Sequence, residues 1–274
     1  MISKYYLLKL FTIALLISIA LTFTAFGCMN IHSDDDLQLI QEKTFSISPG
    51  KKLLVDLSSG DVKVTYWDKS EVHIKIFGNE KAFDKINFTL NGDEESVEVF
   101  GEKKNSTSSW FSNLNVEVEI KVPSKFNLAI NTAGGDIKCG GINGTAQLNT
   151  SGGDVWADKF SGSLNVSTSG GDVFLFCNDA FIEAETSGGD ISLEYSGENK
   201  GIDLSTSGGD IDIKLPESIK AKLDLSTSGG DVSCSFNMSN IKKSYGSSLS
   251  GDINGGGEKL NAHTSGGDIT VTEK

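Results

Sequence analysis

The tetrapeptide Ser-Gly-Gly-Asp recurs along the C-terminal half of this 274-residue chain at a nearly constant interval. With one Ala-Gly-Gly-Asp and one Ser-Gly-Asp variant, its aspartates are Asp136, Asp154, Asp172, Asp190, Asp210, Asp231, Asp252 and Asp268. Successive aspartates are 18, 18, 18, 20, 21, 21 and 16 residues apart. A repeat of this length is typical of a solenoid, in which each unit is one coil that stacks on the coil before it.

The segments on either side of each tetrapeptide alternate between apolar and polar residues. Residues 164–168 lead into one copy and residues 191–195 follow another, both with every second residue suited to a core. A period of two indicates a β-strand with one buried face. The sequence therefore predicts an all-β fold, with a β-solenoid of stacked coils of about 18–21 residues over residues 131–274. We expect each strand to pair with its counterpart one coil away.

The tetrapeptide itself predicts a sharp corner between two strands. Glycine permits positive φ, and we expect the second glycine of each copy to adopt it. The aspartate can accept hydrogen bonds from nearby backbone amides, as in an Asx turn. Aspartates in register repel each other, which leaves two interpretations: a hydrated turn residue, or a carboxylate pair that binds a cation such as calcium. Because the ordered ligand pattern of calcium-binding repeats is missing, we assign no metal site and no cofactor.

The first 27 residues have the features of a secretory signal. Lys4 and Lys9 form a positive start, residues 10–27 are uncharged and mostly apolar, and Cys28 follows directly. A cysteine at this place predicts a lipid anchor on Cys28 and a cell-envelope protein on the extracytoplasmic side.

The match to a lipoprotein signal is incomplete, because Ala25 and Phe26 stand where the usual motif has leucine and a small residue. An uncleaved membrane anchor and free secretion therefore stay open, since the apolar run is just long enough to span a bilayer. Residues 28–44 are expected to be the lipidated cysteine and a tether.

Charge and cysteine content exclude some classes of partner. The formal net charge is −13, and it becomes −15 when the two lysines of the signal are removed. Such a chain does not favour nucleic acid or anionic lipid surfaces. Cys139, Cys177 and Cys234 fall at inward positions of coils that are too far apart for a disulfide, so we expect small buried apolar residues.

Residues 45–130 are rich in strands but have only a degenerate turn, Ser59-Gly60-Asp61. This region predicts an antiparallel β cap, which protects the open end of a solenoid from aggregation. A polar loop at residues 101–115 includes Trp110 and Phe111. These two aromatics are either a buried plug or an exposed tip that binds a partner.

No residues in the sequence form a unique catalytic set. The carboxylates recur identically in every coil, the three histidines are scattered, and no nucleophile elbow or phosphate-binding lysine motif occurs. We expect no enzyme activity. Trp156 and Phe174 lie two residues after their aspartates at outward positions, and Phe176 is also outward. They predict one aromatic patch, which either binds an unknown protein or glycan or is covered by the cap or a second copy.

The passage from Val116 to Ile137, with the repeated Thr-Ser-Gly-Gly-Asp-Val/Ile that follows it, resembles the bacterial "putative adhesin" β-strand-repeat family. The resemblance covers about residues 45–272. It implies a β-solenoid in an envelope protein, and it supplies no catalytic residues because the domain's function is unknown. The resulting expectation is a non-enzymatic, envelope-anchored solenoid that presents a binding face. An accessory lipoprotein of an envelope-stress system is the alternative, and a polysaccharide-active β-helix enzyme is less favoured.

Overall fold

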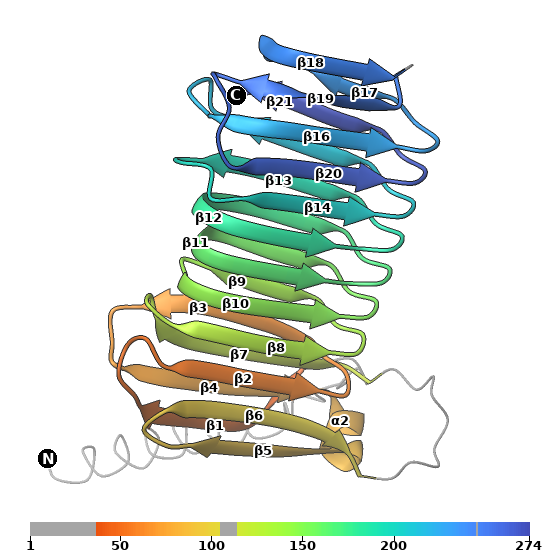
Figure 1. Cartoon of the computed structure of the whole chain (residues 1–274). Helices are drawn as coiled ribbons and strands as arrows, with labels where there is room; N and C mark the ends of the chain where they lie inside the picture. The colour runs from red at the N-terminus through yellow and green to blue at the C-terminus, as the bar shows by residue number, and fades with distance from the viewer. Residues whose placement is uncertain (1–36, 105–113, 245) are drawn as a thin grey trace, which may run out of the picture. The chain divides into compact units, whose positions relative to one another are not determined.

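A computed structural model describes residues 37–104, 114–244 and 246–274, of which residues 37–274 form one compact unit (Figure 1). The signal segment, Cys28, Trp110 and Phe111 lie outside the described residues, so the hypotheses about them stay predictions. The expected tether ends early, because β1 (Gln38–Ser46) already belongs to the sheet. Within the described ranges, no helix has the length and apolar character needed to cross a membrane.

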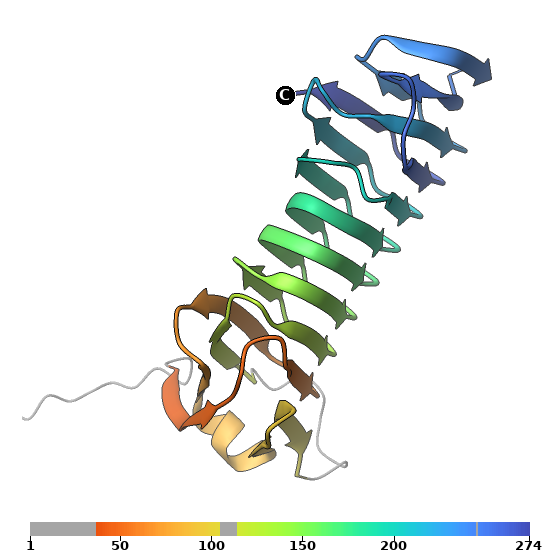
Figure 2. The same cartoon turned by 60° about the vertical axis from the view of Figure 1, so that its left-hand side comes forward.

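The strands form the predicted solenoid, with two rows that meet at the Ser-Gly-Gly-Asp corners (Figures 1 and 2). The first row, whose strands other than β6 lead into the corners, contains β6 (Ser96–Lys103), β2 (Lys52–Leu57), β8 (Asn127–Thr132), β10 (Asn143–Thr150), β14 (Ile202–Thr206), β20 (Lys259–Thr264) and β16 (Ala221–Thr227). The second row leads away from them and contains β7 (Val116–Pro123), β3 (Asp61–Trp67), β9 (Ile137–Gly140), β13 (Ile191–Ser196), β15 (Ile211–Leu215), β21 (Ile269–Glu273) and β17 (Val232–Cys234). Two long strands, β11 (Val155–Ser167) and β12 (Val173–Glu185), contribute to both rows.

The core lies between the two rows and consists of ladders of similar side chains. One ladder joins Ile137, Val155, Val173 and Ile191 in register, and each of these residues is buried. Full burial of such a side chain is worth roughly 1.5–3 kcal/mol. The alternation read from the sequence therefore identified the inward face, and the all-β solenoid prediction is confirmed.

The corner differs from the prediction in its backbone. None of the glycines in the Ser-Gly-Gly-Asp copies has a positive φ. The second glycine is required for another reason: a Cβ on Gly171 would overlap the carbonyl oxygen of Gly153 in the coil below, and Gly153 meets Gly135 in the same way. Several positive-φ residues, including Gly141 and Asp179, instead occur where the second row returns to the first, whereas Gly60 in the degenerate corner does have a positive φ of 136°.

Hydrogen bonds between coils explain why the same residues recur at each corner of this chain. Thr168 donates its hydroxyl proton to the carbonyl oxygen of Gly153 at 3.0 Å and accepts a bond from the amide of Gly171 at 3.4 Å. The carboxylate of Asp154 accepts a bond from the backbone amide of Asp172 at 2.8 Å. The same aspartate bond repeats at every level of the column Asp61, Asp136, Asp154, Asp172, Asp190, Asp210, Asp268 and Asp231. Every carboxylate of the column except that of Asp231, its last member, thus accepts a bond from the next coil rather than from its own turn.

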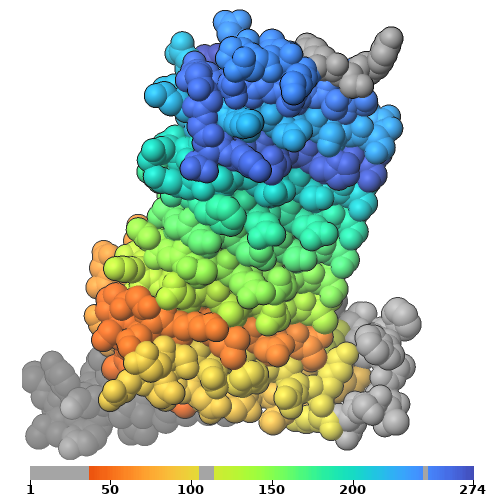
Figure 3. Space-filling model, in the orientation of Figure 1, coloured from red at the N-terminus to blue at the C-terminus, as the bar shows by residue number. Residues whose placement is uncertain are grey.

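The C-terminal coils do not stack in sequence order. Strand β20 lies between β14 and β16, and β21 lies between β15 and β17. In Figure 3 the dark blue C-terminal segment accordingly forms a band below the lighter blue one. The expectation that every coil pairs with its sequence neighbour is wrong at this end.

Asp252 is not a corner residue, which corrects its assignment as a structural turn. It lies within β19 (Ser248–Ile253), which pairs antiparallel with β16 and with β18 (Met238–Ser244). Its carboxylate accepts a bond from the Asn240 side chain at 2.6 Å. The antiparallel hairpin of β18 and β19 occupies the edge of β16 where another coil would otherwise stack.

The N-terminal region combines an antiparallel cap with one coil of the solenoid. Antiparallel pairs join β1 to β4 (Glu71–Gly78), β4 to β7, and β5 (Ile86–Gly92) to β6. A short helix, α2 (Glu80–Lys85), connects β4 and β5. However, β2 and β3 form a parallel coil between β6/β7 and β8/β9. The sheet therefore runs without a break across residue 130.

The three cysteines in the described part of the chain form no disulfide with one another, as expected from their spacing. Cys139 and Cys177 are buried, whereas Cys234 in the terminal coil is half-buried. Burial raises the pKa of both buried thiols to about 12, with smaller contributions from Asp158 for Cys139 and from Cys139 for Cys177.

Candidate functional site

The predicted aromatic patch forms on the second row. Lys138, Trp156 and Phe174 are in register on β9, β11 and β12, because each lies two residues after its corner aspartate. The Trp156 and Phe174 rings are stacked, with centroids 5.2 Å apart and an interplanar angle of 13°. The Lys138 ammonium lies 4.4 Å from the centroid of the Trp156 ring. We call Lys138, Trp156, Phe174 and Phe176 the aromatic column.

This stacking changes what the aromatic column can bind. One face of Trp156 meets Phe174 and Lys138 lies over the ring, so the tryptophan offers chiefly its edge. A sugar ring that stacks on Trp156, as a flat exposed indole would allow, has no free face to use. Small Ser192 follows Phe174 in register, so no aromatic ring or cation of the described residues covers Phe174 on that side. The accessible apolar surface is therefore the Phe174 side of the column.

Phe176 extends this surface outward. Its side chain is 46% exposed, and it lies in register between Asp158 and Glu194. Glu194 pairs with Lys274 at 3.0 Å, and Lys138 pairs with Asp136 at 3.4 Å. An apolar centre with charged residues around it has the composition of an interface with a protein.

The sequence analysis missed Phe181, which is 44% exposed on the first row of the same strand β12. Strand β12 bends at Asp179, whose φ is 49°, and the alternation changes phase there. A Cβ on Gly201, the residue of the next coil that faces Phe181, would lie 3.0 Å from its ring. The Asn178-Asp179 pair was the available signal for the bend, because both residue types tolerate such a backbone.

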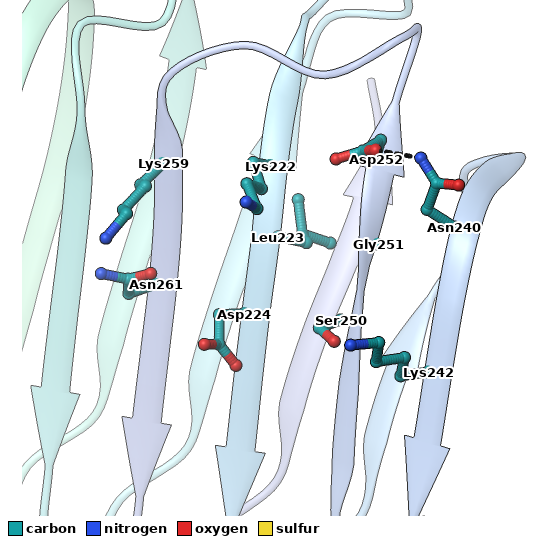
Figure 4. A pocket seen from close by; sticks show the side chains of 10 residues that line it. All are labelled: Lys222, Leu223, Asp224, Asn240, Lys242, Ser250, Gly251, Asp252, Lys259 and Asn261. Carbon is teal, nitrogen blue, oxygen red and sulfur yellow. Dashed lines mark hydrogen bonds between the residues drawn. The ribbon is translucent and has the colours of Figure 1, made fainter.

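A second feature that the sequence did not reveal is a polar hollow of about 460 Å³ near the C-terminal end (Figure 4). Residues of β16, β18, β19 and β20 surround it. Its charged side chains are Lys222, Asp224, Lys242, Asp252 and Lys259. The hollow is on the first row, whereas the aromatic column is on the second.

The described histidines have structural partners. His73 stacks on Trp67 with centroids 5.7 Å apart and pairs with Glu42 at 2.8 Å, and this hydrogen bond is the largest cause of the lowered pKa of Glu42. His263 bonds Ser226 at 3.0 Å. Among the residues the structure describes, no group of three or more His, Cys, Asp or Glu side chains is placed to hold a metal ion.

The sequence matches the family described as Toastrack DUF4097 over residues 50–175 and 127–272. These overlapping segments span most of the chain, which belongs to this family. No curated protein is similar enough to count as a relative.

Three bacterial proteins are among the solved structures to which this chain is similar. A "putative cell adhesion protein" from Clostridium sporogenes has 14% identity and a TM-score of 0.42, over 86% of this chain and 100% of that one. A "putative adhesin" from Bacteroides fragilis has 14% identity and a TM-score of 0.36, over 86% and 97%. A "putative lipid binding protein" from Parabacteroides distasonis has 13% identity and a TM-score of 0.36, over 85% and 96%.

Proposed function

We propose that this protein is a non-enzymatic binding protein of the cell envelope, held there through Cys28, that captures a protein partner on the aromatic column. The observation that supports the site most directly is the 46% exposure of Phe176 beside the stacked Trp156 and Phe174 rings. Exposed aromatics with a charged surround are typical anchors of protein interfaces. The signal-like first 27 residues support the location.

A protein partner fits the aromatic column better than a glycan does. The column uses one face of Trp156 for Phe174 and places Lys138 over the ring, so few ring faces remain for sugars. The edges of these rings and the exposed Phe176 can still insert between side chains of a partner. Adhesion to another cell is one role for such capture, and service to an envelope-stress system is the alternative role.

A photo-crosslinking amino acid at position 176 tests the site in living cells. We expect one dominant crosslinked partner, which mass spectrometry identifies, and no such adduct from position 241. Ile241 is a matched control because it is 51% exposed but lies on the edge strand β18. A surface protein of another cell supports adhesion, whereas a membrane kinase or transporter supports the regulatory role.

The variant Phe174→Ser/Phe176→Ser separates binding from folding. We expect partner capture to be lost while the thermal midpoint falls by only a few degrees, because neither side chain is fully buried. Unchanged capture by a folded variant would move the binding site elsewhere, and Trp110 with Phe111 is then the next candidate. Failure to fold would instead show that these side chains belong to the core.

The anchor is tested separately by metabolic labelling with a clickable fatty acid. We expect incorporation into the wild-type chain and none into Cys28→Ser. Equal labelling of the two proteins contradicts lipidation at Cys28. Hydrolysis of a polysaccharide by the purified protein would contradict the non-enzymatic assignment.

A further inference from the structure

The polar hollow lies where the solenoid ends and the antiparallel hairpin begins. Figure 4 shows side chains of β16 and β20 on one side, β19 in the middle, and β18 on the other side. Its volume of about 460 Å³ lies within the range of sites that bind small molecules. Ser250 and Asp252 alternate outward along β19, while Leu249, Gly251 and Ile253 are buried beneath it.

The hollow differs in charge from the rest of the solenoid. Within residues 131–274, the segment 214–259 has six lysines and five acidic residues, whereas the remainder has four lysines and fifteen acidic residues. The hollow itself is lined by three lysines and two aspartates, so its local charge favours a negatively charged ligand more than the acidic remainder does.

The charges of the lysines around the hollow are not neutralised by the part of the chain that the structure describes. Lys222, Lys242 and Lys259 make no ion pair with any residue that the structure describes. Lys222 and Lys259 are also in register on neighbouring strands, an arrangement in which like charges destabilise each other. A bound anion would relieve this repulsion.

Acceptors between the lysines restrict the kind of anion. Asp224 is in register with Ser250 and Asn261, and Lys222 is in register with Asp252. Carboxylates repel a compact anion such as sulfate but accept hydrogen bonds from hydroxyl groups. The combination suits a ligand with one negative group and several hydroxyls.

We propose that this hollow binds an acidic saccharide, with the ligand's carboxylate near Lys222 and Lys259 and its hydroxyls donating to Asp224 and Asp252. The site is on the opposite row of strands from the aromatic column and near one end of the stack. It is independent of the proposed protein partner, and a glycan on the cell surface or in the envelope is its natural source.

Calorimetric titration with defined oligosaccharides tests the site. The probes are tetragalacturonate, a glucuronate-containing oligosaccharide and a sialylated trisaccharide, each with a neutral counterpart of the same linkage. We expect saturable binding of at least one acidic probe, at least about tenfold weaker binding of its neutral counterpart, and no displacement by sulfate at matched ionic strength.

Charge-removing variants assign the binding to the hollow. Lys222→Gln/Lys259→Gln should weaken the acidic probe by about tenfold, and Lys125→Gln/Lys159→Gln is the matched control that should bind like the wild type. All four lysines are exposed, so both variants should fold. The proposal is overturned if none of the acidic probes binds, if neutral probes bind equally well, if sulfate displaces them, or if the two double variants are indistinguishable.

Discussion

The middle of the solenoid and its two ends share the parallel coil, but the coils are stacked in a different order at the ends. From β9 to β15 each coil stacks directly on its predecessor. At the C-terminal end, β20 and β21 enter between two coils that precede them in sequence. At the N-terminal end, the coil of β2 and β3 lies between strands that follow it. Local turn chemistry therefore determines the shape of a coil but not its level in the stack.

Both ends of the solenoid also have irregular edge strands, whereas the strands of the middle coils are paired on both sides. The edge strand β18 has a register shift between Ser239 and Lys242, with Asn240 at φ 54°. Strand β1, the N-terminal edge of the second row, has a similar irregularity between Leu39 and Gln41. Bulges and charged residues on an edge hinder pairing with another chain. A regular middle coil in either place would instead offer a template for end-to-end growth.

Deleting residues 259–274 should have the largest effect on this comparison. The deletion removes β20 and β21, so β16 and β17 lose their parallel partners while β14 and β15 are exposed. Loss of Leu260, Ile269 and Val271 from the core alone should cost more than about 5 kcal/mol. Hydrogen exchange should show loss of protection in β16 and β17, with β10 protected as an internal control.

The same deletion also tests whether the coils stack out of sequence order at the C-terminal end. In a solenoid that stacks in sequence order, the last coil would peel away and leave all earlier coils protected. Full protection of β16 and β17 in the truncated protein would therefore contradict the inserted position of β20 and β21.

Two neighbouring glycines in the middle should respond very differently to alanine. A Cβ on Gly171 would overlap the Gly153 carbonyl oxygen, whereas one on Gly170 would lie 3.9 Å from its nearest atom, the Ser151 carbonyl oxygen. Neither glycine has a positive φ, so the difference reports close approach between coils alone. We expect Gly171→Ala to lower the free energy of unfolding by at least about 2 kcal/mol and Gly170→Ala to change it by less than about 0.5 kcal/mol.

Urea denaturation of both variants provides the measurement. Equal effects at the two positions would mean that coils are farther apart at the corner than the structure places them.

The aspartate column should be worth more in the middle than at its end. Asp172 accepts a bond from the amide of Asp190, but no amide of a described residue donates to Asp231, the last member. Removing a buried or half-buried acceptor costs roughly 1 kcal/mol. We therefore expect Asp172→Ala to destabilise by about 1 kcal/mol and Asp231→Ala by less than half of that. Asp172→Asn keeps the acceptor and removes a like charge, so its stability should equal or exceed that of the wild type; a loss as large as for alanine would refute the backbone bond.

The sequence sufficed to predict the features that repeat. Alternation identified the strands and the inward residues, and the spacing from each aspartate put Trp156 beside Phe174. The order of coils was not predictable, because the copy at Ser265-Gly-Gly-Asp268 has the same threonine, glycine and aspartate contacts to offer at any level. In the structure, the antiparallel hairpin of β18 and β19 occupies the other edge of β16. The shortened Ser-Gly-Asp at residues 250–252 was misread as a corner because it fits the spacing of the repeat, although it lies within β19.

The candidate sites were predictable to different degrees. The aromatic column follows from register within the regular middle. That Lys138 lies over Trp156 follows only from side-chain positions. Phe181 depends on a change of phase at a bend, and the polar hollow depends on strands that meet out of sequence order. The periodicity of the sequence therefore predicts neither the exposure of Phe181 nor the polar hollow.

The smallest expected effect is a difference in thiol reactivity between the cysteines of the middle coils and the cysteine of the terminal coil. Burial raises the pKa of Cys139 and Cys177 from 9.0 to about 12, so at pH 8 only about one part in ten thousand of either thiol is ionised. Cys234 in the terminal coil is half-buried, and we expect a thiol reagent to modify it first and the other two only on unfolding. Because the folded-state pKa values lie above the unfolded ones, their contribution to stability is complete below pH 9 and is lost as pH rises toward 12. Peptide mapping after timed labelling at pH 8 gives the order, and early labelling of Cys139 or Cys177 in the native protein would mean that the middle coils open more readily than the end.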